Sequence, residues 1–141
     1  MDIQDVIKFA NEIGTCYLAT IDEDKPRVRG MRMWKADKDG FWFHTGITKN
    51  LCKQLKKNPK IEISFYNNAM DLETMRMLRV NGEVEFVDDT GIKLGLMEER
   101  PFLKAISTTE TLMVFKIYKG EAWFWTMKDN LDEDGMERVK F

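Results

Sequence analysis

Hydroxyl, glycine and lysine residues gather where an aromatic strand meets a lysine-rich helix, within residues 41–59. A helix N-terminus exposes unpaired backbone N–H groups and carries a positive partial charge, so a phosphate can bind there. Thr48 is expected to cap the helix and offer its hydroxyl, Lys49 adds a positive charge, and Gly46 lets the backbone approach a ligand closely. On spacing alone a second interpretation stays open, in which Thr48 only caps the helix and Lys49 is solvated.

Three arginines add to this cluster. Arg27, Arg29 and Arg32 lie in an alternating segment that we expect to be a strand. A hairpin turn follows, which would pair this strand with residues 41–43 and bring its Arg29 end near Thr45. An arginine and a helix N-terminus would then converge on one phosphate. The strand between them would offer backbone groups and large side chains to a flat ring.

Other chemistries lack their residues. The chain has one histidine, His44, and no G-x-S-x-G, which excludes a hydrolytic triad and a zinc ligand set. Cys16 and Cys52 match no metal or redox spacing and are expected to be buried thiols. No phosphate-binding Walker loop or G-x-G-x-x-G is present. A calcium loop near the end of the chain would place Phe141 where a glutamate is required.

The bulk composition predicts one globular domain over residues 1–141. The chain is 43% hydrophobic and 33% charged, and its 22 basic and 24 acidic residues leave a net charge of −2. This balance argues against a generic polyanion binder, although a local basic patch stays open. No apolar run reaches membrane-spanning length and the first residues do not resemble a signal peptide, so we expect a cytoplasmic protein.

Apolar periodicity and turn residues predict a mainly β protein with helices. The expected helices are 3–13, capped by Asp2; a second capped by Thr48 and ended by Asn58-Pro59; and 88–100. The expected strands are 16–21, 27–35, 41–45, 60–67, 77–87 as one broken strand or a pair, and two within 111–127 around Lys119-Gly120. The tail 128–141 is expected to be peripheral. About six strands without β-α-β alternation favour an antiparallel barrel or strongly curled sheet.

The order YLATIDEDKPRVRGM, then DGFWFHTGITKNLCKQLKKNPKIEISFY, resembles the flavoproteins related to pyridoxamine-phosphate oxidase. It is similar to their short branch of general stress and nitroimidazole-resistance-like proteins. The resemblance covers residues 5–127 and is strongest over 16–66. It implies the FMN-binding split barrel, a six-stranded antiparallel Greek-key barrel, and a homodimer that holds two FMN molecules at its interface.

The resemblance also assigns roles to single residues. Arg29 matches the arginine on the phosphate and ribityl side of FMN. Thr48 and Lys49 match the phosphate-binding pair that opens the helix. The other matching positions are Gly30, Met31 and Arg32, whose backbone lines the isoalloxazine, and His44 and Thr45 beside the cofactor.

Two positions depart from the vitamin B6 oxidases of this family. Trp34 stands where those enzymes carry a lysine that touches cofactor and substrate, and Thr48 stands where they usually have an arginine. The chain is also too short for their C-terminal substrate segment. We therefore expect an FMN-dependent oxidoreductase that reduces a small acceptor, with a nicotinamide or another electron donor, rather than a vitamin B6 oxidase.

The remaining expectations concern two tryptophans near the end of the chain, the role of Arg32, and the functions that compete with flavin binding. Trp123 and Trp125 share one face of a strand and either fill a barrel or dimer core or, from a partner chain, cover the flavin ring. Arg32 is a candidate for the flavin N1–C2=O edge. A non-catalytic nucleic-acid module using the arginines is disfavoured by the near-neutral charge. A split barrel holding a deazaflavin, or a haem with His44 as axial ligand, also stays open.

Overall fold

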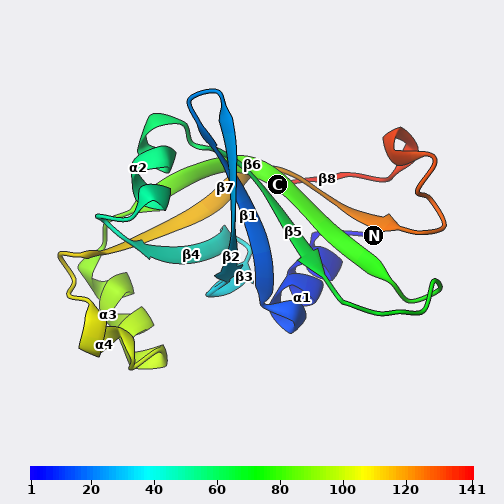
Figure 1. The fold of residues 1–141 in the computed structure, drawn as a ribbon. Helices are drawn as coiled ribbons and strands as arrows, with labels where there is room; N and C mark the ends of the chain where they lie inside the picture. Colours follow the sequence, from blue (N-terminus) through cyan, green and yellow to red (C-terminus); the bar gives the residue numbers. More distant parts are fainter.

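The computed structural model describes residues 1–141 without a gap and contains one sheet with helices at its ends (Figure 1). The elements are α1 (Ile3–Ile13), β1 (Thr15–Asp22), β2 (Lys25–Arg32), β3 (Lys35–Asp37), β4 (Gly40–Gly46), α2 (Asn50–Lys57), β5 (Lys60–Tyr66), β6 (Arg76–Val87), α3 (Thr90–Glu99), α4 (Leu103–Ile106), β7 (Leu112–Thr126), a 3-10 turn (Glu133–Gly135) and β8 (Val139–Lys140). None of the helices combines the length and the hydropathy that a bilayer crossing requires.

The strands form one antiparallel sheet in the order β2-β1-β5-β6-β7-β4-β3, with β8 added beside β7. The sheet curls around a core but does not close, so β2 and β3 remain its two edges. The mainly β split-barrel class is therefore confirmed. The expected strand count is wrong, because there are eight strands rather than six.

The core lies inside the curl. Leu18, Ile63, Val80 and Ala122 are register partners across β1, β5, β6 and β7, and all are fully buried. Side chains of neighbouring strands that face each other lie on one face of a sheet, so these residues mark the inner face. α1 covers one end of this core, and its first turn is held by the expected Asp2 cap in a reciprocal capping box.

A smaller apolar cluster joins α3 and α4 to the opposite face of β4 and β7. It contains Trp42, Leu96, Met97, Leu103, Leu112 and Val114. The expected helix over 88–100 is confirmed as α3, which begins after the Asp89 cap. Both cysteines are buried as expected, and burial raises the pKa of Cys16 to about 12.

The expected hairpin between the arginine strand and residues 41–43 is wrong. β2 pairs with β1 instead, over the register from Thr15–Arg32 to Asp22–Lys25. The chain leaves the sheet at buried Met33, and only the short β3 forms the hairpin with β4. The alternation of the sequence continues through this break, which is why it suggested a single strand.

Residues 77–87 lie in one long strand, β6, which agrees with the single-strand alternative expected for them. Residues 111–127 also form one strand, β7, where two strands around Lys119-Gly120 were expected. Gly82 and Gly120 are register partners, and the register shifts directly after them at Glu83/Val84. These glycines therefore allow two strands to bend across each other without a turn. The tail expected at the periphery returns to the sheet, because β8 pairs with β7 and Phe141 stacks edge-on against Phe41.

Candidate functional site

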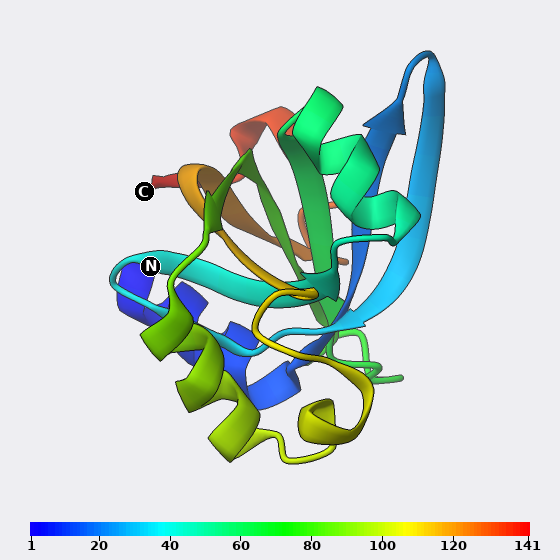
Figure 2. The same ribbon diagram turned by 90° about the vertical axis from the view of Figure 1, so that its left-hand side faces the viewer.

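Figure 2 shows the edge strand β2 standing beside α2 and the end of β4. Two adjoining chambers between these elements form one cleft. Its first chamber, of about 1010 Å³, lies between β2 and α2. Its second chamber, of about 860 Å³, lies between the end of β4 and the α3–α4 segment. Both chambers are lined by Gly30, Met31, His44, Thr45, Thr48 and Lys49. Residues from distant parts of the sequence therefore meet at one place.

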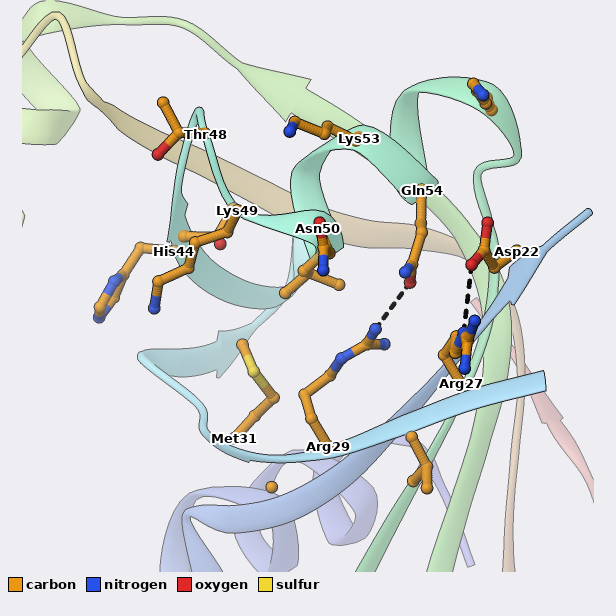
Figure 3. Close-up of a pocket in the computed structure, with 15 residues that line it drawn as sticks. Asp22, Arg27, Arg29, Met31, His44, Thr48, Lys49, Asn50, Lys53 and Gln54 are labelled. Atoms are coloured by element: carbon orange, nitrogen blue, oxygen red, sulfur yellow. Dashed lines mark hydrogen bonds and ion pairs between the residues drawn. The ribbon is translucent and has the colours of Figure 1, made fainter. Parts of the chain in front are cut away.

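The first chamber carries a strong excess of positive charge. Its cations are Arg27, Arg29, Lys49, Lys53 and Lys57, and its only acidic side chain is Asp22. Asp22 already pairs with Arg27 at 3.1 Å, and no carboxylate lies within 4.0 Å of the other cations. Figure 3 shows Arg27, Arg29, Lys49 and Lys53 around the chamber. A site with uncompensated cations attracts an anion.

The N-terminus of α2 opens into this chamber. The helix begins at Asn50 with Lys49 as its N-cap, so the expected Thr48 cap is wrong. No side chain caps the helix and its first turn has no acidic residue. Lys53 donates the first backbone bond, to Lys49 at 3.2 Å, which leaves the N–H groups of Asn50, Leu51 and Cys52 without a partner. Thr48 still lines the cleft and keeps its hydroxyl free for a ligand.

Thr45 supplies a second unpartnered donor. Its side chain is only 5% exposed, and its hydroxyl has no hydrogen-bond partner in the chain. A buried hydroxyl without a partner costs about 1–3 kcal/mol. Thr45 lines both chambers, so a polar atom of a ligand in the cleft would satisfy this group.

Arg29 reaches the chamber from β2, and its guanidinium is held in place by hydrogen bonds to two other side chains. It donates to the hydroxyl of Thr20 at 2.8 Å and to the side-chain oxygen of Gln54 at 2.7 Å. Figure 3 shows Arg29 and Gln54 pointing toward each other from β2 and α2. Burial, and then the nearby Arg27, lower the pKa of Arg29, but a guanidinium remains charged at neutral pH.

His44 lines both chambers and contacts Arg100, which lines the second. The Nη1 atom of Arg100 donates to Nε2 of His44 at 2.8 Å, because arginine cannot accept. Burial, followed by the charges of Arg100 and Lys49, lowers the pKa of His44 to about 4. His44 is therefore neutral at pH 7 and carries its proton on Nδ1.

Hydrogen bonds join the end of α3, which forms one wall of the second chamber, to the segment between β2 and β3. Arg100 donates to the carbonyl of Met33 at 2.8 Å, and the indole of Trp34 donates to Glu99 at 2.6 Å. Trp34 also packs edge-on against Trp42 and lines neither chamber. These contacts hold the C-terminal end of α3 beside the cleft.

Eight of the ten residues expected at the site line the cleft: Arg29, Gly30, Met31, Arg32, His44, Thr45, Thr48 and Lys49. Trp123 and Trp125 do not line it. Trp123 is buried on β7 beneath the guanidinium groups of Arg138, at 4.0 Å, and Arg79, at 5.4 Å. Within one chain, both tryptophans are therefore separate from the cleft.

Sequence reasoning missed Gln54 and Arg100 as site residues. Gln54 stands on α2, one turn after Asn50, so its place on the cleft side of the helix could have been read from helical spacing. Arg100 follows α3 and reaches His44 only through tertiary packing, 56 residues along the chain. No local pattern marks that contact.

Comparisons with known proteins agree with this architecture. The family model described as pyridoxamine 5'-phosphate oxidase matches residues 3–124. The chain is 31% identical over 80 residues to a pyridoxine/pyridoxamine 5'-phosphate oxidase of Pelagibacter ubique, and 34% identical over 80 residues to one of Rhodopseudomonas palustris. Each match covers 56% of this chain but 36% of the oxidase, so the chain matches little more than a third of those enzymes.

Solved structures extend the likeness over nearly the whole chain. A NimC/NimA family protein of Clostridium acetobutylicum is 28% identical, with a TM-score of 0.78 over 98% of this chain and 92% of that one. General stress protein 26 of Bacillus anthracis, at 15% identity, shares the fold over 100% of both chains with a TM-score of 0.72. With the family model matching residues 3–124, the chain belongs to the pyridoxamine 5'-phosphate oxidase family.

Proposed function

We propose that this protein binds FMN in the cleft and acts as a flavin-dependent oxidoreductase on a small acceptor. The observation that carries the proposal is a convergent set of free backbone donors and of positive charges that no carboxylate neutralises. The free N–H groups of α2, the Lys49 ammonium and the Arg29 guanidinium surround a space without a free carboxylate. These groups suit a phosphate monoester, and the family membership supports a flavin as its bearer.

The residues fit the rest of the cofactor as well. β2 is an edge strand, so part of its backbone N–H and C=O groups are unpaired where Gly30, Met31 and Arg32 line the cleft. Those groups, with the hydroxyl of Thr45, would meet the polar edges of the flavin ring. Bound FMN supplies the electron-transfer chemistry, and the chain supplies position, charge and exclusion of water.

His44 contributes a neutral hydrogen-bonding group in this proposal. Arg100 occupies Nε2, so Nδ1 carries the donor hydrogen. A ring with a pKa of about 4 does not provide a proton at neutral pH. Because Nε2 is engaged, the structure offers no support for His44 as a haem ligand. The positive charges of Arg32 and Arg100 remain near the second chamber for stabilising an anion.

The acceptor is proposed to differ from vitamin B6. Trp34, at the position where the B6 oxidases carry a lysine, packs against Trp42 and bonds Glu99 instead of facing the cleft. The oxidases named above share only the 80-residue segment, so their activity does not transfer as a whole. We infer reduction of a small acceptor, with a nicotinamide or another donor supplying electrons.

A homodimer is part of the proposal. The face of the sheet opposite the core, called here the outer face, includes Tyr17, Ala19, Val28, Gly30, Glu62, Ser64, Tyr66, Met77, Arg79, Asn81, Glu121, Trp123 and Trp125. Tyr17 is 63% and Val28 is 68% exposed on this face. A hollow on it shares Gly30 and Met31 with the cleft. A second copy packed there would reach the bound flavin, and its Trp123 or Trp125 is the proposed cover for the ring.

Lys49 gives the sharpest test of the phosphate site. Lys49→Ala removes a charge-assisted contact and should weaken FMN binding about ten- to a hundredfold. Flavin fluorescence titration of the purified protein, after any bound flavin is removed, measures the affinity. The matched control is Lys56→Ala, an exposed lysine on the same helix that does not line the cleft.

Two outcomes would contradict the proposal. A folded wild-type protein that takes up no FMN, judged by its absorption spectrum, would remove the flavin function. Equal FMN affinity in Lys49→Ala and Lys56→Ala would remove the α2 N-terminus from the site. A salt-sensitive shift with oligonucleotides, without flavin uptake, would favour the nucleic-acid alternative.

A further inference from the structure

A directed hydrogen-bond network lies behind Arg29. Arg29 donates from Nη1 to the hydroxyl of Thr20 at 2.8 Å and from Nη2 to Oε1 of Gln54 at 2.7 Å. The Thr20 hydroxyl in turn donates a hydrogen bond to the same Gln54 oxygen at 2.6 Å. Thr20 is only 3% exposed, so this polar group is fixed inside the protein.

The network holds the guanidinium through N–H groups of Nη1 and Nη2. The carbonyl of Leu18 accepts a further, longer bond from Nη1 at 3.4 Å. These bonds do not use all the N–H groups of the guanidinium, and those that remain are available to the chamber that Arg29 lines. The orientation is anchored from two elements, since Thr20 belongs to β1 and Gln54 to α2. Arg29 therefore has a fixed direction before any ligand binds.

The acceptors are all uncharged. A hydroxyl, an amide and a carbonyl position Arg29, whereas Asp22 pairs with the neighbouring Arg27. An arginine held by a carboxylate would lose most of its net attraction for an anion. An arginine held by an amide keeps its full charge for the ligand.

We infer that Gln54 is a positioning residue for anion recognition, which aims Arg29 into the cleft while leaving its charge unpaired. This inference rests on the proposed function and deepens it, since it assigns the selection of a phosphorylated flavin over an unphosphorylated one to the Thr20–Gln54–Arg29 network. The side-chain amide of Gln54 also lines the chamber, and its nitrogen donates to no group of the chain.

Gln54→Glu tests the inference with almost no change in shape. The carboxylate can accept both existing bonds, so the fold is retained, but it neutralises Arg29 and repels a phosphate. FMN affinity should fall about ten- to a hundredfold. Affinity for riboflavin, which lacks the phosphate, should stay within about twofold. Gln4→Glu, on the exposed first turn of α1, makes the same change in net charge away from the cleft and is the control.

Melting temperature with added pyrophosphate gives a readout that needs no flavin. Pyrophosphate should raise the melting temperature of the wild type and of Gln4→Glu but not that of Gln54→Glu. If this pattern appears while the wild type takes up no FMN, the flavin function fails and the role of Gln54 stands. Equal responses of Gln54→Glu and Gln4→Glu to FMN and pyrophosphate, or an equal loss of riboflavin and FMN affinity, would overturn the inference.

Discussion

At the residue scale, the environment of His44 makes a direct spectroscopic prediction. His44 is the only histidine, so its ring signals in NMR need no assignment. Burial, Arg100 and Lys49 lower its pKa from 6.5 to about 4. A ¹⁵N titration should therefore show a neutral ring with Nδ1 protonated at pH 7 and a midpoint near 4. Arg100→Leu removes one of the two charges and should move the midpoint upward.

The same shift makes stability depend on pH. The unfolded chain binds the histidine proton below pH 6.5, whereas the folded chain resists it until about pH 4. The contribution of neutral His44 to the free energy of unfolding is therefore complete above pH 6.5 and is lost as the pH falls from 6.5 toward 4. Because His44 is only partly buried, solvent screening limits the loss to about 1–2 kcal/mol.

Urea unfolding at pH 7 and pH 4.5 measures this loss. Other groups also titrate between these pH values, so the wild type is compared with the variant His44→Gln, in which those groups are unchanged. The amide oxygen of the glutamine can still accept from Arg100. The variant should lose less stability than the wild type between the two pH values. Identical losses, or a titration midpoint near 6.5, would contradict the environment described here.

Local sequence was informative about the site residues because short-range geometry places them. Gly46, Thr48 and Lys49 adjoin the start of α2 in any strand–helix connection. Arg29 lines the same cleft although the hairpin expected to bring it there does not form, because β2 pairs with β1. Arg100 has no such local determinant, since its position depends on how α3 packs against β4. Thr48 shows the limit of local rules, because a good capping residue stands two positions before the helix begins and makes no cap bond.

At the element scale, the crossing of β6 and β7 depends on glycine. A Cβ atom on Gly120 would overlap the backbone carbonyl of Asn81, and neither backbone can move without breaking the pairing of two long strands. Gly120→Ala should destabilise the protein by about 2–4 kcal/mol. Gly95→Ala is the control, since nothing lies within 4 Å of its Cβ position on α3.

Gly95→Ala should instead stabilise the protein by about 0.5–1 kcal/mol, because alanine favours the helix. Urea unfolding of the two variants measures both changes. A neutral Gly120→Ala would mean that the two strands are not in close contact at this point. The pair of variants thus separates a steric requirement from the general effect of a glycine on chain entropy.

The strands were predictable in their apolar patterns but not in where they break or continue. Residues 60–67 alternate cleanly and form β5, and the apolar run 16–21 forms β1, both close to the expected bounds. A glycine in the sequence does not by itself distinguish a turn from a bend within a strand. Lys119-Gly120 resembles a turn, but β7 continues through it without a break. Pairing of β2 with β1 is a hairpin across the two turn residues Glu23 and Asp24, which is a local feature of the chain. The break at Met33, which separates β2 from β3 and β4, is not marked by the apolar pattern.

At the scale of the whole molecule, the outer face predicts the assembly. Tyr17 lies on this face, as the register partner of Gly30 and Ser64, and is 63% exposed. A stable interface buries about 1,200–2,000 Å² and draws much of its energy from such aromatic residues. The protein should therefore elute with about twice the 16.6 kDa mass of one chain in light-scattering chromatography.

Tyr17→Glu introduces a charge at the proposed interface and should shift the mass toward one chain. FMN affinity should fall with it, because the hollow beside Tyr17 shares Gly30 and Met31 with the cleft. Leu94→Glu, at a 51% exposed position on α3, controls for a charge placed on a surface leucine elsewhere. A wild-type protein that binds FMN tightly at the mass of a single chain would show that one copy completes the site. The tryptophans of β7 would then have no part in covering the flavin.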